Sequence, residues 1–167
     1  MDALDSGHVG KLFIGHGRSP AWKNLRDFLK DRLHLEWVEY DRDAVAGYAT
    51  KERLEQMLAE AWFAFLVMTG EDERPDGTIH ARDNVIHEVG LFQGKLGFTR
   101  AIILLEDGCA EFSNIIGLTQ IRFPKGDIMA RSEEIRRVLE RELNRRADNL
   151  VTEIRFDYLP DKLTKHG

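Results

Sequence analysis

The sequence predicts an α/β fold of the flavodoxin type, in which a five-stranded parallel sheet carries helices on both faces. Three observations support this prediction: short apolar runs alternate with segments of helical periodicity, turn residues separate them, and one run is apolar throughout. That run, residues 61–68, has the composition of a strand covered on both faces. For five strands of this type the expected order in the sheet is 2-1-3-4-5.

The expected elements alternate between strand and helix. The first strand, residues 11–14, ends at the turn signal Gly15-His16-Gly17. The next helix is expected to have Ser19 as its N-cap and Pro20 as its first residue. The remaining expected elements are a strand at 35–40, a polar loop at 41–49, a helix capped by Thr50, a strand at 61–68, a polar loop at 69–83, a helix at 84–97, strands at 101–105 and 119–123, and a helix from about 128 to 146.

The length of 167 residues suits one domain, expected at residues 11–147. Residues 1–10 are expected to form an N-terminal tail. Residues 148–167 are expected to form a C-terminal extension that either packs on the domain or adds a strand.

Charge and composition exclude several classes of function. The formal net charge of −5 argues against nucleic-acid binding. No apolar run reaches the roughly 18 residues of a membrane span, and the N-terminus lacks a signal-peptide pattern, so a cytoplasmic protein is expected. The single cysteine, Cys109, cannot form an internal disulfide, and the acidic turn around it disfavours the thiolate.

The expected site lies where the strand order reverses, outside the carboxyl ends of the first and third strands. Those ends carry Gly15-His16-Gly17-Arg18 and Thr69-Gly70-Glu71-Asp72. The backbone amides of the first segment and the Arg18 guanidinium are suited to hold phosphate oxygens. The same segment is also compatible with a plain strand-to-helix turn, because it is not the Gly-x-Gly-x-x-Gly dinucleotide fingerprint.

The helix expected at 84–97 has two distinct faces. An apolar stripe should face the core, and it consists of Val85, Val89, Phe92 and Leu96. Asn84 and Glu88 are four residues apart and share another face near the helix N-terminus, where a carboxylate is stabilised. From spacing alone, Glu88 is either a solvated surface charge or a catalytic carboxylate.

Three glycines, Gly90, Gly94 and Gly97, also recur at helical spacing in this segment. Each costs about 1 kcal/mol relative to alanine inside a helix. They indicate that another backbone approaches closely, either from the domain's own sheet or from a second copy of the chain.

Three sequence motifs stand out: Lys11-Leu12-Phe13-Ile14-Gly15-His16-Gly17 followed by a helix, Arg82-Asp83-Asn84-Val85-Ile86-His87-Glu88-Val89-Gly90, and Gly94-Lys95-Leu96-Gly97. Together they resemble the bacterial TIR-like predicted nucleotide-binding family, the TIR type found in cyclic-nucleotide-activated antiphage effectors. The similarity runs from about residue 10 to about residue 145. Many members of that family have an aromatic residue where this chain has His87 and a leucine where it has Val89, and neither change removes the glutamate.

The resemblance implies a flavodoxin-like TIR fold and NAD+ nucleosidase activity, with Glu88 as the essential catalytic residue. It also implies activation by homotypic TIR–TIR assembly, with a site completed across neighbouring domains. The loop after the second strand, residues 41–50, would be the mobile loop that reaches the neighbour. An upstream cyclic-nucleotide sensor, as a domain or a separate protein, is a further implied partner.

The chemistry of the reaction agrees with a site built on one carboxylate. Cleavage of the nicotinamide–ribose bond passes through an oxocarbenium-like state, and the cationic leaving group departs neutral without a general acid. One carboxylate suffices to bind ribose hydroxyls, stabilise positive charge and orient water. No metal or redox cofactor is expected, because NAD+ is the substrate and the histidine spacing matches no ligand pattern.

The other site residues are assigned by position. The nucleotide side of the cleft is expected to comprise Phe13, Gly15, His16 and Arg18. Thr69 and Gly70 would form the other wall, with Asn84 as a polar support beside Glu88. Two alternative functions stay open: a non-catalytic TIR module that signals by homotypic assembly, and a domain that senses a nucleotide without consuming it.

Overall fold

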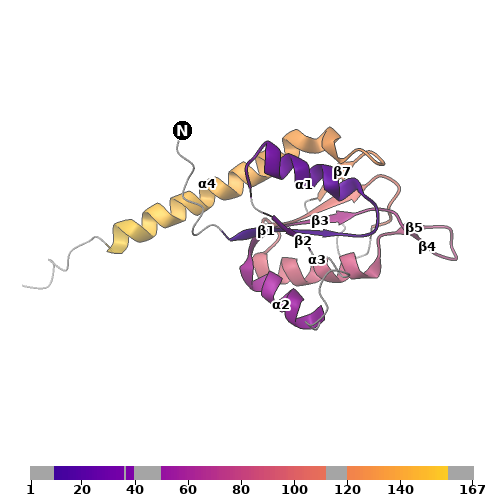
Figure 1. Cartoon of the computed structure of the whole chain (residues 1–167), viewed down its shortest axis with the longest axis horizontal. Coiled ribbons are helices and arrows are strands. Elements are labelled where there is room, and N and C mark those ends of the chain that lie inside the picture. The colour runs from indigo at the N-terminus through magenta and orange to yellow at the C-terminus, as the bar shows by residue number, and fades with distance from the viewer. Residues whose placement is uncertain (1–9, 36, 40–49, 112–119, 158–167) are drawn as a thin grey trace, which may run out of the picture. The chain divides into compact units, whose positions relative to one another are not determined.

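The computed structural model describes residues 10–35, 37–39, 50–111 and 120–157. The N-terminal tail expected at 1–10, apart from Gly10, and the loop expected at 41–49 lie outside these residues. The elements, labelled in Figure 1, are β1 (Lys11–His16), α1 (Ala21–Asp31), β2 (Trp37–Glu39), α2 (Thr50–Glu60), β3 (Ala61–Met68), β4 (Asp72–Glu73), β5 (Ile79–His80), α3 (Asp83–Leu96), β6 (Ala101–Glu106), β7 (Gln120–Phe123), the 3-10 helix η1 (Ile128–Arg131) and α4 (Ser132–Asp157).

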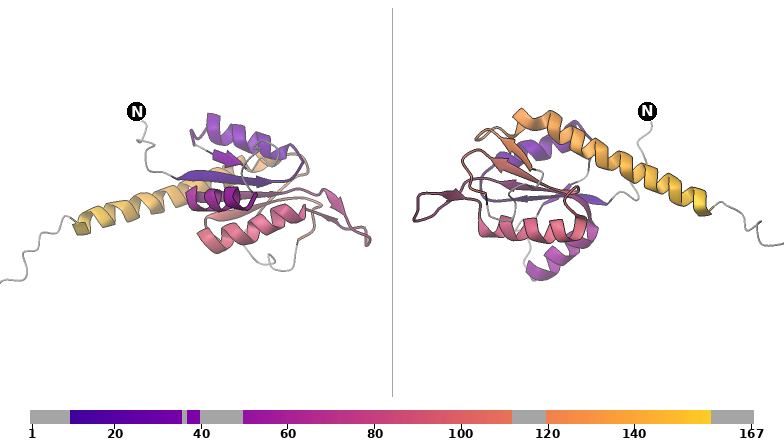
Figure 2. Two further views of the ribbon diagram at one scale, coloured as in Figure 1. Left: turned by 60° about the horizontal axis from the view of Figure 1, so that its bottom comes forward. Right: turned by 180° about the vertical axis from the view of Figure 1, so that it is seen from behind.

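The predicted α/β class, with a parallel sheet and helices, is confirmed. The strands of the main sheet lie in the order β2-β1-β3-β6-β7, and every neighbouring pair is parallel. Helices α1 and η1 lie on one face of this sheet, and α2 and α3 lie on the other (Figures 1 and 2). Strand β3 has the predicted bounds, and all eight of its residues are buried.

The core between α3 and the sheet is aromatic and aliphatic. The predicted apolar stripe of α3 is buried, as expected. Phe92 from this stripe stacks on Phe13 of β1, with their ring centroids 4.1 Å apart, and both side chains are fully buried. Each such side chain contributes roughly 1.5–3 kcal/mol to folding. This packing fixes α3 against β1 and therefore fixes the position of every polar residue that α3 carries.

The boundaries at the first strand and helix differ from the predicted ones. Gly15 and His16 belong to β1, where they pair with β3, so the turn begins at Gly17. Pro20 is the N-cap of α1 rather than its first residue. Ser19 still contacts the start of the helix, because its hydroxyl accepts from the Ala21 amide at 3.5 Å, while its own amide donates to the Glu71 carboxylate at 3.2 Å.

The segment predicted as a polar loop at 69–83 contains a small antiparallel hairpin. Its strands β4 and β5 have two residues each, and Asp72 pairs with His80. The hairpin projects from the end of the main sheet in Figure 1 and in both views of Figure 2. Strands this short leave no alternating apolar pattern, so they cannot be predicted from the sequence.

Residues 133–167 form a compact unit distinct from residues 1–132. In this unit α4 extends to Asp157, so the predicted helix end near residue 146 was wrong. Residues 147–157 contain neither glycine nor proline, and nothing in them stops the helix. The alternative of an added strand therefore does not apply to residues 148–157. None of the described helices is long and apolar enough to span a membrane.

The three glycines of the α3 segment lie on an open face. A Cβ atom built on Gly90, Gly94 or Gly97 would meet no atom within 4 Å. Close packing of these glycines on the domain's own sheet, one of the two predicted explanations, is therefore wrong. Gly97 has a separate reason to be glycine, because it ends α3 with φ +79° and ψ 168°, a conformation almost restricted to glycine.

We expect Gly94→Ala to stabilise the domain by about 0.5–1 kcal/mol, because alanine favours a helix and the added methyl group meets nothing. The matched variant Gly97→Ala should instead destabilise it by about 1–3 kcal/mol through backbone strain. Urea unfolding followed by circular dichroism would measure both. A loss of stability in Gly94→Ala similar to that in Gly97→Ala would contradict the open face.

Candidate active site

Glu88 lies in α3 directly beneath the carboxyl end of β1. Its side chain is buried, with only 4% of its surface exposed, so the reading of Glu88 as a solvated surface charge is wrong. A Cβ atom on Gly15 would lie 2.7 Å from Glu88 Oε2 and 2.8 Å from Leu66 Cδ1. Glycine at position 15 therefore leaves room for the carboxylate. A carboxylate shielded from water acts more strongly on a nearby positive charge than an exposed one.

His16 is fixed by the first helix. Its ring stacks on Trp22 at 4.0 Å with an interplanar angle of 10°, and His16 Nδ1 lies 2.7 Å from the Gly17 carbonyl oxygen. The Arg26 guanidinium carbon lies 5.3 Å from the centroid of the Trp22 ring. The half-buried imidazole is thus held in one orientation at the end of β1.

The turn between β1 and α1 binds a carboxylate of the protein itself. Glu71 Oε1 accepts hydrogen bonds from the backbone amides of Arg18 at 2.6 Å and Ser19 at 3.2 Å. Glu71 Oε2 accepts one from the hydroxyl of Thr69 at 2.8 Å. From the sequence, Glu71 is recognisable only as part of a strand end. The contact could not be predicted, because the backbone amides that bind Glu71 lie 53 and 52 positions away in the chain.

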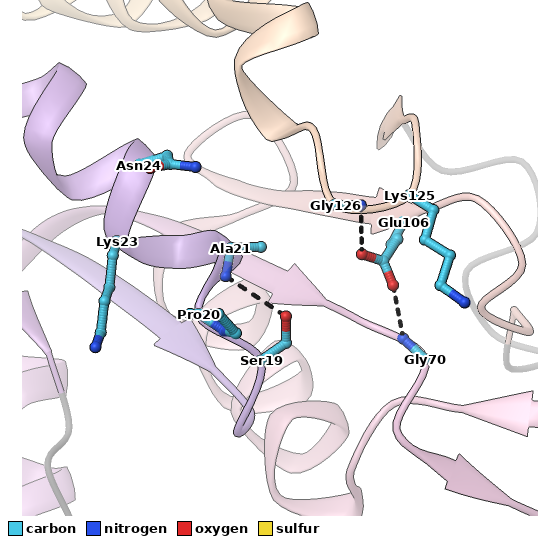
Figure 3. Close-up of a pocket in the computed structure, with 9 residues that line it drawn as sticks. All are labelled: Ser19, Pro20, Ala21, Lys23, Asn24, Gly70, Glu106, Lys125 and Gly126. Carbon is cyan, nitrogen blue, oxygen red and sulfur yellow. Dashed lines mark hydrogen bonds between the residues drawn. The ribbon is translucent and has the colours of Figure 1, made fainter.

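A second carboxylate, that of Glu106, connects the segments that follow β3 and β7. Glu106, the last residue of β6, is 6% exposed, and its two oxygens accept from the amides of Gly70 at 3.3 Å and Gly126 at 3.1 Å (Figure 3). It lines a cavity of about 540 Å³ between the start of α1 and the loop after β7, as Figure 3 shows. The lining residues are Ser19, Pro20, Ala21, Lys23, Asn24, Gly70, Glu106, Lys125 and Gly126. Sequence reasoning missed Glu106, although an acidic residue that ends a buried strand was a usable signal.

The predicted site residues do not form one group in the structure. Gly15 and Glu88 lie together, and Thr69 meets the amide of Arg18 through the shared carboxylate. The side chains of Arg18 and Asn84 are exposed at this edge. Phe13 does not line a cleft, because it is fully buried against Phe92; a strand residue two positions before Gly15 lies inside the sheet rather than at its edge.

Cys109 is buried near the same edge. Burial raises the pKa of its thiol to about 11, and the negative charges of Glu106 and Glu71 add to the effect. This agrees with the expectation that the acidic turn disfavours the thiolate. Among the residues that the structure describes, no three His, Cys, Asp or Glu side chains gather into a group that could hold a metal ion.

Comparison with known proteins identifies similar sequences. Residues 11–125 match the family model described as "CAP12/Pycsar effector protein, TIR domain". A CD-NTase-associated protein 12 from Flavobacterium daejeonense is 32% identical over 163 residues, which is 94% of this chain and 51% of the relative. A protein of the same name from a Lachnospiraceae bacterium (strain RUG226) is 34% identical over 64 residues, 36% of this chain and 20% of the relative.

A third relative, the uncharacterized protein YuaY of Escherichia coli (strain K12), is 27% identical over 114 residues, 65% of this chain and 38% of the relative. The chain thus spans about half the length of the first of these relatives and a smaller part of the other two.

We expect native Cys109 to react with iodoacetamide at pH 8 about two orders of magnitude more slowly than the unfolded chain, because the thiolate is the nucleophile and the raised pKa keeps the thiol protonated. The native rate should rise about tenfold per pH unit above pH 8 and level off only above about pH 11, where the thiol is deprotonated. Mass spectrometry gives a clean measurement, since the chain has a single cysteine. Equal native and unfolded rates at pH 8 would show that the thiol is neither buried nor perturbed.

Proposed function

Because the chain belongs to the family of CAP12/Pycsar effector TIR domains, a bacterial TIR family of cyclic-nucleotide antiphage effectors, we propose that it is an NAD+ nucleosidase that releases nicotinamide and ADP-ribose. The observation that carries this proposal is the buried carboxylate of Glu88, which lies against Gly15 at the carboxyl edge of the parallel sheet. This edge is where open α/β sheets bind their ligands.

Glu88 is proposed as the catalytic carboxylate. As the bond between nicotinamide and ribose breaks, positive charge develops on the ribose ring. A carboxylate in a water-poor environment stabilises that charge strongly and can orient the attacking water. Nicotinamide leaves as a neutral base, so the reaction needs neither a general acid nor a metal or redox cofactor; NAD+ is the substrate.

The residues around Glu88 supply binding groups for the rest of the nucleotide. The turn that follows β1 offers the Arg18 backbone amide and guanidinium to the diphosphate. His16 stands at the same edge with its ring held against Trp22. On the other side, Thr69 and Gly70 directly follow β3, and Asn84 lies exposed at the first turn of α3. Phe13 is left out of the proposed binding surface.

Assembly of several copies is proposed as the activating event. The face of α3 that carries Gly90 and Gly94 is open, and Phe98 beyond its end is 56% exposed. Open small residues let a neighbouring backbone approach, and an exposed aromatic ring adds apolar area to such a contact. A cyclic-nucleotide sensor, as a domain or a separate protein, would bring the copies together. The proposal that residues 41–50 reach the neighbour concerns a segment that lies outside the described residues, apart from Thr50.

We expect Glu88→Gln to reduce nicotinamide release about 100-fold or more, because the neutral amide no longer stabilises the cationic transition state. The measurement is chromatography of nicotinamide and ADP-ribose after the protein is incubated with NAD+, free and displayed on a multivalent scaffold. Glu55→Gln is the matched control, since Glu55 is an exposed glutamate of α2 whose side chain is 63% accessible.

Full activity in Glu88→Gln would remove Glu88 from the mechanism. If neither the unchanged protein nor its variants consume NAD+ on the scaffold but the protein forms polymers, the non-catalytic assembly module is the better description. Tight binding of a nucleotide that is never consumed would instead support the sensing domain.

We expect Gly94→Arg to lower the gain in NAD+ cleavage on clustering about tenfold or more, because a symmetric contact would bring two added positive charges together. The control is Gly94→Ala, which keeps the open face uncharged. Sedimentation velocity measures the assembly of copies, and nicotinamide release measures NAD+ cleavage. Unchanged clustering and activity in Gly94→Arg, with an intact thermal transition, would exclude this face of α3 from the assembly.

A further inference from the structure

The carboxylate of Glu71 occupies the turn that the proposed function assigns to the diphosphate of NAD+. Its three donors, the amides of Arg18 and Ser19 and the hydroxyl of Thr69, are neutral groups that all point at one half-buried anion. Backbone amides that precede a helix, together with a hydroxyl, are also the groups that bind phosphate oxygens in proteins. The turn therefore binds an anion in this structure, and that anion is the carboxylate of Glu71 from the same chain.

Gly17 shows that the fit between the turn and the carboxylate is close. A Cβ atom at this position would fall on Glu71 Oε2 and lie 2.8 Å from the carboxyl carbon. Gly17 is not among the described glycines with a positive φ, so its backbone conformation does not require glycine. The space that the missing side chain leaves is filled by the Glu71 carboxylate. The other carboxylate oxygen, Oε1, accepts from the amides of Arg18 and Ser19, so a ligand oxygen bound to these amides would need the place of Oε1.

The segment that carries Glu71 leads into the β4–β5 hairpin, which is separate from the main sheet and is joined to the segment after β6 by a hydrogen bond from the Ala110 amide to the Ile79 carbonyl at 2.7 Å. Glu71 opens the β4–β5 hairpin, in which its amide donates to the His80 carbonyl at 2.9 Å. The hairpin strands have two residues each, and most of the hairpin is exposed. Elements with few buried contacts are the ones that open at low free-energy cost. A rotation of the Glu71 side chain alone would also free the two amides.

We infer that Glu71 is an internal anionic gate, whose carboxylate occupies the phosphate-binding amides of the β1–α1 turn and must leave before a nucleotide diphosphate can bind. This inference rests on the proposed function, and it names how that same site is regulated. The carboxylate excludes a diphosphate in two ways, because both anions need the same donors and because their charges repel. Assembly, which the proposed function requires for activity, would then act by favouring the form in which Glu71 has withdrawn.

The alternative role of Glu71 is a structural latch that shapes the turn for its ligand. The two roles predict opposite signs for the removal of the side chain. A latch predicts weaker binding of phosphate-bearing ligands once the turn loses its support. A gate predicts tighter binding, because every molecule of the variant has the turn free, whereas in the unchanged chain only a minor population has the Glu71 carboxylate withdrawn. If that form is about one tenth of the population, apparent affinity is reduced about tenfold.

The test compares ligand affinity in four proteins by isothermal titration calorimetry: the unchanged chain, Glu71→Ala, Glu71→Gln and Glu73→Ala. The ligands are ADP-ribose, which carries two phosphates and has no nicotinamide to lose, and adenosine, which carries none. Glu73 is the matched control because it is an exposed acid on the same hairpin, so its removal changes the net charge equally without touching the turn.

We expect ADP-ribose to bind Glu71→Ala about tenfold more tightly than the unchanged chain, with adenosine unaffected and Glu73→Ala unchanged. Glu71→Gln should also bind ADP-ribose more tightly, though by less than Glu71→Ala, because it removes the charge repulsion while its amide oxygen can still compete for the turn. If Glu71→Ala does not fold, as judged by its thermal transition, Glu71→Gln carries the test. Equal or weaker ADP-ribose binding in a folded Glu71 variant overturns the gate.

The outcome separates the gate from the proposed activity. Tighter ADP-ribose binding in the Glu71 variants, with no release of nicotinamide from any protein, would support the gate and count against the hydrolase. Nicotinamide release that depends on Glu88, combined with weaker ADP-ribose binding in the Glu71 variants, would support the hydrolase and make Glu71 a latch.

Discussion

The candidate site depends on the parallel pairing of β1 with β3. Because the two strands run side by side to the same edge, the residues that follow them emerge next to each other. This is why Glu71 reaches the amide of Arg18 although 53 positions separate them in the chain. Helix α3 packs against the same pair of strands through the stacked rings beneath them, and this brings Glu88 to Gly15. Without this register neither carboxylate would meet the end of β1.

Three carboxylates therefore gather at one edge of a small sheet, and their surroundings distinguish them. Glu71 and Glu106 each accept backbone amides that tie neighbouring strand ends together. Glu88 is buried beside Gly15, whose lack of a side chain leaves room for the carboxylate. Under the proposed function, Glu88 is the carboxylate that stabilises the cationic transition state. The negative charges of Glu106 and Glu71 also raise the pKa of the Cys109 thiol, in addition to the larger effect of burial.

The sequence predicted the parts of the fold that follow from local pattern and missed the parts that follow from distant contacts. Strand β3 was predicted to the residue because an unbroken apolar run has few other interpretations. Glu88 could be proposed as a site residue from the sequence because it occurs in a helix with a clear apolar stripe and a specific motif, and the structure shows it buried beside Gly15. The roles of Glu71 and Glu106 were missed because the backbone amides that they bind lie far away in the chain, beyond any periodic signal. The separations are 53 and 52 positions for Glu71, and 36 and 20 positions for Glu106. Phe13 was misassigned because the pattern gave its strand but not how far that strand extended towards the edge.

The glycines of this domain show why residue type alone does not reveal a purpose. Gly15 and Gly17 leave space that two carboxylates fill, so their effect is local and complete within the described structure. Gly90 and Gly94 weaken α3, yet within the described residues no atom uses the space they leave. Under the proposed function, that helical cost is offset only when another copy covers the open face. Helix α3 would then carry Glu88 on one face and the assembly contact on another. A contact that holds the helix more firmly would also hold the carboxylate, which links assembly to catalysis through one rigid element.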